Sequence, residues 1–523
     1  MSGVDAPARP QRGDVLELRI DSLAYGGEGV ARLGDSPPGG SGEHGPAPGG
    51  PAARGPAPGG RAERGGGYVV FVAGAIPGDL VRAVVHKRKR SYAHARTLEV
   101  LDPSPERLAP TASHPGVPWQ VIPYECQLEI KRAQVDEALA RIGHLEGYEL
   151  EEIVPALQRW RYRNKLEYSF GGGSTGDPVY GGELVCGFHA SAGARRVEPM
   201  TDCLLASEQG NLAREAALRW CRAQGLSAWD RGWDPEPGAS REPSATHGAR
   251  RQRDQRTAPA ADGRARLRNL VVREGRRTGK LQVRIVTTDG ELDAGTLAAA
   301  LSAELGERLS GVLWTRSRSL AETTAGGETE LVWGEAELPE RLGGLDLLIS
   351  SEAFFQTNTE MAELLYGVAG EYAALEGWER VYDLYCGIGT IALTLAPRAG
   401  ELWGIELVEQ AVADAIAGAG RNGVTNARFF AGDARLALPE LIERAGRPDV
   451  VVVDPPRAGL SKKVVHRIID ASPRRIVYVS CNPTTLAPNA AELAAAGWRL
   501  RRVRPVDMFP QTHHIECVAL LER

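Results

Sequence analysis

A cysteine after an apolar run is the first candidate for chemistry. The run Ile476–Val479 is followed by Ser480, Cys481, Asn482 and Pro483. Ligands of parallel α/β sheets bind at the carboxyl ends of the strands, where a thiolate can act as a nucleophile. Most cysteines are small residues of the core, but polar neighbours and a proline favour a site turn. Cys481 is therefore the candidate nucleophile.

Two further segments carry groups that could move protons. The apolar run Val450–Val453 ends in Asp454-Pro455-Pro456, which is similar to the motif with which amino-methyltransferases present polar groups to a base. Near the C-terminus, His513, His514 and Glu516 could each accept a proton, or could form the polar edge of a terminal hairpin.

Glycines and acids follow three successive apolar runs. Residues 383–390, DLYCGIGT, place Gly387 and Gly389 where a strand turns into a helix and the backbone can approach a ligand. Glu406 ends the next run and could bind ribose hydroxyls, and Asp433 ends the third and could meet an adenine amine. Either acid alone could be a helix cap. The ordered series is typical of class I S-adenosylmethionine methyltransferases.

The elements that must position these residues also have a clear pattern. From residue 378 on, short apolar runs alternate with helix-length segments, which predicts a parallel sheet with helices on both faces. Residues 14–34 have a strand pattern that resumes at Tyr68. Residues 35–66 lack Leu, Ile, Val, Phe, Met, Trp and Tyr and repeat GPAPGG, so we expect a disordered insertion in a small β-module.

The middle of the chain is mixed. Residues 124–146 are expected to form a helix, with an apolar stripe from Leu128 to Ile142. Residues 232–264 are rich in Pro, Ala, Arg and Asp and are interpreted as a surface insertion. Strands are expected at LVVRE, LQVRIVTT and GVLWTRS, which are residues 270–274, 281–288 and 311–317.

Composition bounds the class of protein. The 523 residues suggest about three to four domains of roughly 150 residues each. A net charge of −5 excludes a histone-like binder but not a local basic patch. No apolar run approaches the roughly 18 residues of a membrane helix, and the N-terminus lacks a secretory apolar region. The seven cysteines form no CxxC pair, so we expect a reducing cytoplasm and no disulfide framework.

Two basic clusters could bind a nucleic acid. Residues 86–90, HKRKR, stand beside Tyr92 and His94, and charge with stacking is how OB-like modules bind oligonucleotides. A second cluster, residues 159–165, contains three arginines and Lys165. A solvated face is the alternative interpretation of both.

Five motifs together resemble those of the RNA uracil-C5 methyltransferases. FFQTN at 354–358, DLYCGIGT at 383–390, DPPRAG at 454–459, SCNP at 480–483 and HHIE at 513–516 occur in that family's order. Residues 18–32 and 68–83 resemble the TRAM domain that many ribosomal-RNA members carry. Residues 159–171 and 267–275 resemble the family's central domain.

The resemblance covers most of the chain and implies an α/β fold in three parts. An OB-like β-barrel of the TRAM type is expected over 11–105, a mixed α+β RNA-binding domain over 106–350, and a Rossmann-like class I methyltransferase domain over 351–523. RNA is the expected partner, a membrane is not, and a monomer is expected.

The resemblance also implies a mechanism. The Cys481 thiolate adds to carbon 6 of uracil, carbon 5 accepts a methyl group from S-adenosylmethionine, and Glu516 removes the carbon 5 proton. We expect the Cys481 pKa to be lowered, or the thiol to lose its proton on substrate binding. The target base must leave any stack. Gln356 and Asp454 match positions that contact the cofactor or hold the uracil edge. The other positions expected to line the cofactor pocket are Tyr385, Gly387, Gly389, Thr390, Glu406 and Asp433.

One departure from the family concerns iron. Many relatives hold an iron–sulfur cluster, for which four thiolates are the usual requirement. Here only Cys126 is near the stretch where those relatives have closely spaced cysteines, and Cys203 resembles the family's remote fourth ligand without its partners. We expect no cluster and no metal, and we expect Cys186, Cys203 and Cys221 to be buried thiols.

Three alternatives stay open at this point. The preferred substrate is 23S ribosomal RNA, because of the TRAM-like module, and transfer RNA is its close variant. An exocyclic-amine N-methyltransferase would use Asp454-Pro455-Pro456 and would need neither Cys481 nor Glu516. A non-catalytic RNA-binding or assembly factor would not need the complete catalytic set.

Overall fold

The computed structural model describes residues 9–33, 67–173, 180–189, 196–229 and 263–523. These residues separate into two units, one reaching Thr111 and including Pro118–Ile130, the other formed by Ala112–Val117 and Lys131–Arg523. The insertion expected at 35–66 lies outside the described residues, as does the one expected at 232–264 up to residue 262. The expected boundaries at 105 and 350 stay a prediction.

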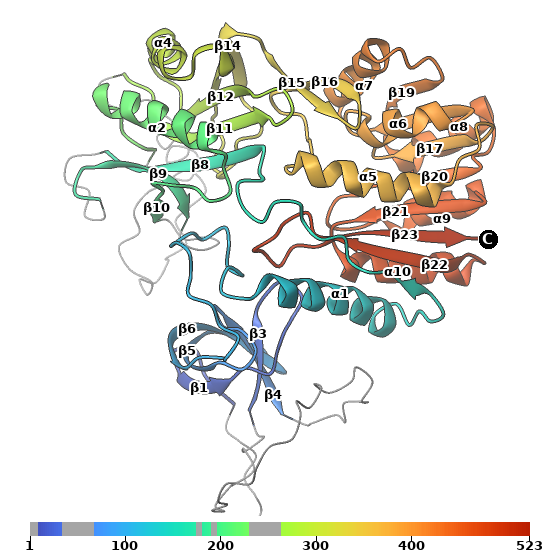
Figure 1. Ribbon diagram of the computed structural model, residues 1–523, viewed down its shortest axis with the longest axis horizontal. Coiled ribbons are helices and arrows are strands. Elements are labelled where there is room, and N and C mark those ends of the chain that lie inside the picture. Colours follow the sequence, from blue (N-terminus) through green and yellow to red (C-terminus); the bar gives the residue numbers. More distant parts are fainter. Residues whose placement is uncertain (1–8, 34–66, 174–179, 190–195, 230–262) are drawn as a thin grey trace, which may run out of the picture. The chain divides into compact units, whose positions relative to one another are not determined.

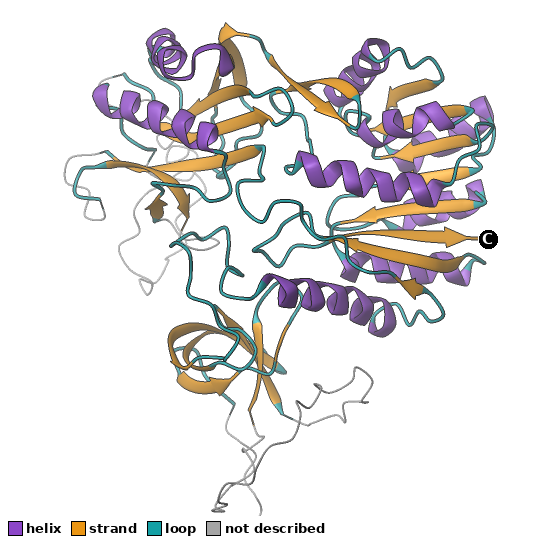
Figure 2. Ribbon diagram, viewed as in Figure 1, coloured by secondary structure: helices purple, strands orange, loops and turns teal. Residues whose placement is uncertain are grey.

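The first unit is a six-stranded sheet that curves around a small apolar core (Figures 1 and 2). Its order is β1-β5-β6-β4-β3-β2, and β4 pairs with β6 in parallel. Alternate side chains such as Val70 and Val72 point inward, which confirms the expected period of two. The strands are β1 (Val15–Arg19), β2 (Ser22–Leu23), β3 (Gly29–Leu33), β4 (Tyr68–Ala73), β5 (Leu80–Arg88) and β6 (Tyr92–Asp102).

The second unit begins with a seven-stranded sheet of order β10-β9-β8-β11-β12-β13-β14. Helices α2 (Glu208–Ala223) and α4 (Ala294–Leu305) share one apolar cluster with this sheet. The three strands expected from sequence are confirmed as β11, β12 and β13. The strands are β8 (Lys165–Gly172), β9 (Leu184–His189), β10 (Val197–Pro199), β11 (Leu267–Gly275), β12 (Lys280–Thr287), β13 (Leu309–Arg316) and β14 (Glu328–Gly334).

An eight-stranded sheet of order β19-β18-β17-β20-β21-β23-β22-β7 holds the C-terminal motifs. Its first five strands are parallel, as expected, and β23 runs antiparallel to β21. A two-stranded ribbon, β15 (Glu337–Leu342) and β16 (Leu345–Ser350), precedes it. The strands are β7 (Glu149–Leu150), β17 (Arg380–Leu384), β18 (Glu401–Glu406), β19 (Ala427–Ala431), β20 (Val450–Val453), β21 (Arg475–Ser480), β22 (Arg499–Val506) and β23 (Glu516–Glu522).

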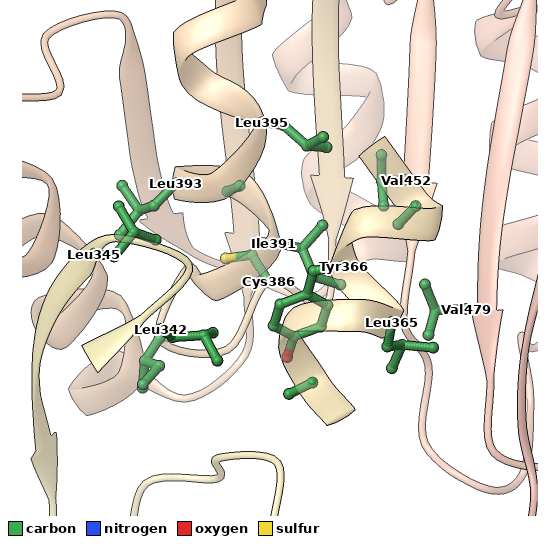
Figure 3. Close-up of a cluster of buried hydrophobic side chains, with 14 of the residues drawn as sticks. Leu342, Leu345, Leu365, Tyr366, Cys386, Ile391, Leu393, Leu395, Val452 and Val479 are labelled. Carbon is green, nitrogen blue, oxygen red and sulfur yellow. The ribbon is translucent and has the colours of Figure 1, made fainter. Parts of the chain in front are cut away.

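Helices cover both faces of this sheet, which explains why β20 is apolar throughout. Val450 and Val452 belong to a cluster with α5 (Thr359–Ala373), α6 (Thr390–Leu395) and α7 (Glu409–Arg421). Val451 and Val453 belong to the opposite cluster with α8 (Ala434–Ala445), α9 (Lys462–Ala471) and α10 (Pro483–Ala495). Figure 3 shows part of the first cluster, including Tyr366 of α5 and Leu342 and Leu345 of the ribbon.

The helix expected at 124–146 is present as α1 (Tyr124–Arg141) but ends earlier. His144 has a φ of 50°, a left-handed conformation that ends a helix. Leu139 is buried in the apolar cluster of the eight-stranded sheet, whereas Ile142 is 48% exposed, so the expected stripe was wrong at that end. Lys131 of α1 is fully buried, which the apolar pattern did not indicate.

Candidate active site

The parallel strands bring the predicted residues to one edge of the sheet. Glu406 ends β18, Asp454 follows β20, and Cys481 follows β21. Because β23 is antiparallel, its first residue, Glu516, lies at that same edge. The last residue pair of β21 and β23 is Ser480 with Cys517, so Cys481 and Glu516 stand one residue beyond it, directly across from each other.

The glycine turn has the backbone that the motif requires. Gly387 and Gly389 have φ values of 55° and 80°, a region that favours glycine, and Gly389 is the N-cap of α6. A Cβ at Gly389 would meet the Ala415 Cβ at 3.0 Å, whereas one at Gly387 would have nothing within 4 Å. The turn is therefore packed on its helix side and open at Gly387.

Both expected cofactor acids hold backbone groups. The Glu406 carboxylate accepts hydrogen bonds from Gly387 N at 3.1 Å and Val408 N at 2.9 Å. Asp433 is the N-cap of α8, accepts a bond from Arg435 N at 2.9 Å, and pairs with the Arg435 guanidinium, which lowers the Asp433 pKa. The helix-cap interpretation is thus confirmed for Asp433, and Glu406 ties the glycine turn to the neighbouring strand.

Cys481 and Glu516 share an electrostatic environment. Glu516 is 4% exposed, and its Oε2 has no hydrogen-bond partner among the described residues. Burial, followed by the Asp454 charge, raises the Glu516 pKa well above its usual range, and the Arg457 charge opposes them. Burial, then the charges of Glu516 and Asp454, raises the Cys481 pKa to about 12, and Arg457 again opposes.

The expectation of a lowered Cys481 pKa is therefore wrong for this structure. The thiol is half-buried, two carboxyl groups act on it, and a single cation, Arg457, favours its thiolate. Loss of the proton on substrate binding is the alternative that stays a prediction.

Two buried groups that sequence reasoning missed, Asp383 and Tyr366, interact electrostatically with Asp454. Burial raises the Asp454 pKa to about 7. Asp383 of β17 is fully buried, neither carboxyl oxygen has a hydrogen-bond partner among the described residues, and burial with the Asp454 charge raises its pKa well above the usual range. The Tyr366 hydroxyl accepts a bond from Thr390 Oγ1 at 3.2 Å, and burial and the Asp454 charge raise its pKa. A carboxylate inside an apolar strand was the available signal for Asp383, because such a group needs a partner.

The segment before α5 and the loop 507–515 lie together at the site. Gln356 is 5% exposed, and its carbonyl accepts a bond from Asn164 Nδ2 at 2.8 Å. Asn358 Nδ2 donates to Met508 O at 3.0 Å. Burial and neighbouring positive charges lower the His513 pKa and bring the His514 pKa to about 3. Of the candidate proton acceptors, the histidines are therefore weak bases here, and Glu516 is the stronger one.

Three of the other cysteines belong to the central part of the chain and not to this site. Cys186, Cys203 and Cys221 are buried, as expected. His114 Nε2 lies 3.2 Å from Cys203 Sγ, and burial lowers the His114 pKa to about 4. Within the described residues, no group of three or more His, Cys, Asp or Glu is placed to hold a metal. Absence of an iron–sulfur cluster stays a prediction.

The two expected basic clusters differ in the structure. In the first unit, the His94 ring lies 5.4 Å from Phe71 and 5.5 Å from Tyr92, and Lys87–Arg90 are exposed beside them. This aromatic group has the charge and stacking surfaces expected of an oligonucleotide site. In the second cluster two of the four cations are paired with acids, Arg161 with Asp202 at 2.8 Å and Lys165 with Glu167 at 2.5 Å.

No helix in the described part of the chain is long and apolar enough to cross a membrane.

The chain matches two family models, tRNA (uracil-5-)-methyltransferase over residues 347–523 and the TRAM domain over residues 9–98. It is 32% identical to an uncharacterized RNA methyltransferase of Halalkalibacterium halodurans, covering 100% of this chain and 99% of that one. It is 36% identical to another from Porphyromonas gingivalis, covering 87% and 95%.

A solved structure is similar along nearly the whole chain. The tRNA (uracil-54, C5)-methyltransferase of Pyrococcus abyssi, in complex with S-adenosyl-L-homocysteine, has a TM-score of 0.67 and 25% identity, covering 97% of this chain and 100% of that one. The relatives, both family models and the similar solved structure all indicate an RNA methyltransferase. The chain belongs to the RNA uracil-C5 methyltransferase family and is an RNA methyltransferase with an N-terminal TRAM domain.

Proposed function

We propose that this protein methylates carbon 5 of a uridine in RNA, with S-adenosylmethionine as the methyl donor and Cys481 as the nucleophile. The observation that carries the proposal is the pair formed by Cys481 and Glu516, directly across from each other at the edge where the parallel strands end. An amine-methylating enzyme needs no thiol and no buried carboxyl group in that arrangement.

The residues at the strand ends fit the donor. S-adenosylmethionine has a sulfonium and an ammonium group, and the unpartnered carboxyl oxygens of Asp383 suit a cation that brings hydrogen-bond donors. The open turn at Gly387 allows close approach of a ligand. When bound, the donor supplies an electrophilic methyl group. The other residues that would hold it are Gln356, Tyr385, Gly389, Thr390, Glu406, Asp433 and Asp454.

The chain's own groups account for the remaining steps. Carbon 5 of uracil is a poor nucleophile. Once Cys481 has lost its proton, its sulfur bonds to carbon 6, and the electrons of the ring double bond form an enolate that makes carbon 5 reactive. After carbon 5 has accepted the methyl group, the Glu516 carboxylate takes the carbon 5 proton, the double bond re-forms, and the Cys481 thiolate leaves.

Arg457 is the cation that favours both ionised groups. Its charge opposes burial at Cys481 and at Glu516. Asn482 Nδ2 donates to Arg457 O at 3.0 Å, so the turn that carries Cys481 also holds the backbone at Arg457. Binding of a cationic donor near Asp454 would also reduce the negative potential that, after burial, raises the Cys481 pKa.

The proposed substrate is 23S ribosomal RNA, for which the TRAM domain and its aromatic, basic surface are the support. Transfer RNA is the competing substrate, because the similar Pyrococcus abyssi enzyme is a tRNA methyltransferase. In both cases the uridine must be unstacked, because the reactive groups lie at a buried sheet edge.

Trapping with 5-fluorouridine tests the reaction. A base can remove a proton from carbon 5 but cannot remove a fluorine atom. RNA carrying 5-fluorouridine should therefore remain attached to the protein in the presence of S-adenosylmethionine and shift the protein's band on a denaturing gel. Ribosomal and transfer RNA fragments are compared in parallel. The band should vanish in Cys481→Ala and persist in the matched control Cys126→Ala. Methylation of both RNAs without any band would instead support the amine-methylating alternative.

A further inference from the structure

The loop between β22 and β23 leads directly into Glu516 and is held from several sides. Its backbone amide at Asp507 donates to Val154 O at 2.9 Å, and Gln511 within it has a φ of 66°. Three of its carbonyls accept bonds from side chains: Met508 O from Asn358 Nδ2 at 3.0 Å, Phe509 O from Thr512 Oγ1 at 2.7 Å, and Pro510 O from Tyr162 at 3.1 Å.

A buried ion pair also anchors this loop. Lys131 Nζ lies 2.6 Å from Asp507 Oδ1 and 3.1 Å from Phe509 O, and both charged side chains are 0% exposed. Removing two charges from water is unfavourable, and apolar residues of similar size often replace such pairs without loss of stability. Apolar residues could not replace the hydrogen bonds of this pair. Lys131 donates to both the Asp507 carboxylate and the Phe509 carbonyl, and so fixes two points of one loop.

The loop also connects two cores. Phe509 packs against the apolar cluster of α5 and the C-terminal sheet and against that of the seven-stranded sheet, and the Arg163 guanidinium lies 5.8 Å from its ring centroid. A loop held at its start, at three carbonyls and at Phe509 has little freedom. Because Glu516 directly follows this loop, its backbone is restricted as well.

We propose that Lys131 and Asp507 are positioning residues that hold the loop 507–515 so that the Glu516 carboxyl group stays opposite Cys481. The inference rests on the proposed function, in which Glu516 removes the carbon 5 proton. Neither residue contacts the reacting atoms; both act through the loop.

The test separates the step that needs Glu516 from the steps that precede it. The variant Lys131→Met with Asp507→Leu replaces the pair by apolar residues. Adduct formation with 5-fluorouridine RNA reports thiol addition and methyl transfer. Release of tritium from RNA labelled at carbon 5 of uridine reports proton removal. Because a displacement of about 1 Å can cost roughly a hundredfold in rate, we expect tritium release to fall tenfold or more while adduct formation stays within about threefold.

A matched control removes a different ion pair, from the two strands that lead to Cys481 and Glu516. Arg475 and Glu522 pair at 2.9 Å at the far end of β21 and β23. Replacing them by Met and Leu should leave the ratio of the two rates unchanged. A second variant, Tyr162→Phe, removes one hydroxyl anchor of the loop and keeps the ring. It should shift the ratio of the two rates in the same direction as the double variant, and it serves as the test if the double variant does not fold.

Three outcomes overturn the inference. Equal losses of both rates would mean a structural role, and unchanged rates would mean no role. Glu516→Gln, measured alongside, distinguishes a failure of the proposed function: if that variant releases tritium normally, the base is elsewhere and the inference falls with it. If Glu516→Gln releases no tritium while the double variant releases it at the wild-type rate, only the inference about Lys131 and Asp507 is wrong.

Discussion

The half-buried carboxyl group of Asp454 should make the protein less stable as pH rises. Burial raises its pKa from 3.8 to about 7, so the folded protein favours the neutral form more strongly than the unfolded chain does. The resulting stabilisation is complete below 3.8 and is lost as pH rises through about 7. At pH 8 the ionised, buried group costs at most about 4 kcal/mol, since each pKa unit corresponds to about 1.4 kcal/mol.

Asp454→Asn removes this cost. We expect the free energy of unfolding of the wild type to fall between pH 5 and pH 8, and that of the variant to fall less, by up to about 3 kcal/mol, because part of the total is already lost at pH 5. Urea denaturation of both proteins at the two pH values, without S-adenosylmethionine, measures the difference. Asp470→Asn on the exposed surface of α9 is the control and should follow the wild type. Parallel pH dependences for wild type and Asp454→Asn would refute the reasoning.

Other consequences concern the reaction, the cofactor turn and RNA binding. On ordinary RNA, Glu516→Gln should accumulate the covalent adduct on denaturing gels, because the carbon 5 proton cannot leave; normal turnover would move the base elsewhere. The Cys481 thiol should react with iodoacetamide about tenfold or more slowly than an unperturbed cysteine at pH 8, since its pKa is raised to about 12, and mass spectrometry of the labelled peptide measures this. Gly389→Val should weaken S-adenosylmethionine binding at least tenfold by calorimetry, because φ is 80° and the Ala415 Cβ is 3.0 Å from the added carbon; unchanged binding would contradict the role of the turn. Replacing Lys87–Lys89 by alanine should reduce the salt dependence of RNA binding, with up to about 0.7 lost from the logarithmic slope per phosphate contact, and an unchanged slope would place the RNA elsewhere.

Much of the candidate site could be predicted because its signals are local. An apolar run that ends in polar residues, as at Cys481, marks the end of a buried strand, and parallel strands bring such ends together. The same reasoning placed Glu406 and Asp454. The glycines of the cofactor turn could be recognised because a sharp strand-to-helix connection needs their backbone freedom. The C-terminal end of α1 was misjudged, because an apolar residue, Ile142, continued the period beyond Arg141, the residue at which the helix ends.

Protonation states could not be predicted from the sequence. The Cys481 pKa depends on burial and on the charges of Glu516 and Asp454, which come from other strands. The same holds for the difference between the two basic clusters, since Arg161 is neutralised by Asp202, a residue 41 positions away. A run of like charges in the sequence does not reveal which of its members have found a partner.

The sequence by itself determined the order of strands and helices in the C-terminal half, the glycine turn, and the identity of the thiol and carboxyl groups at the strand ends, because each depends on neighbouring residues. Only the tertiary structure decided that Lys131 and Asp507, 376 positions apart, form one buried pair, and that Asp383 and Asp454 form one carboxyl cluster with Glu516. Burial and electrostatic interaction depend on distance in space, and distance in space between remote segments is set by the packing of the whole unit.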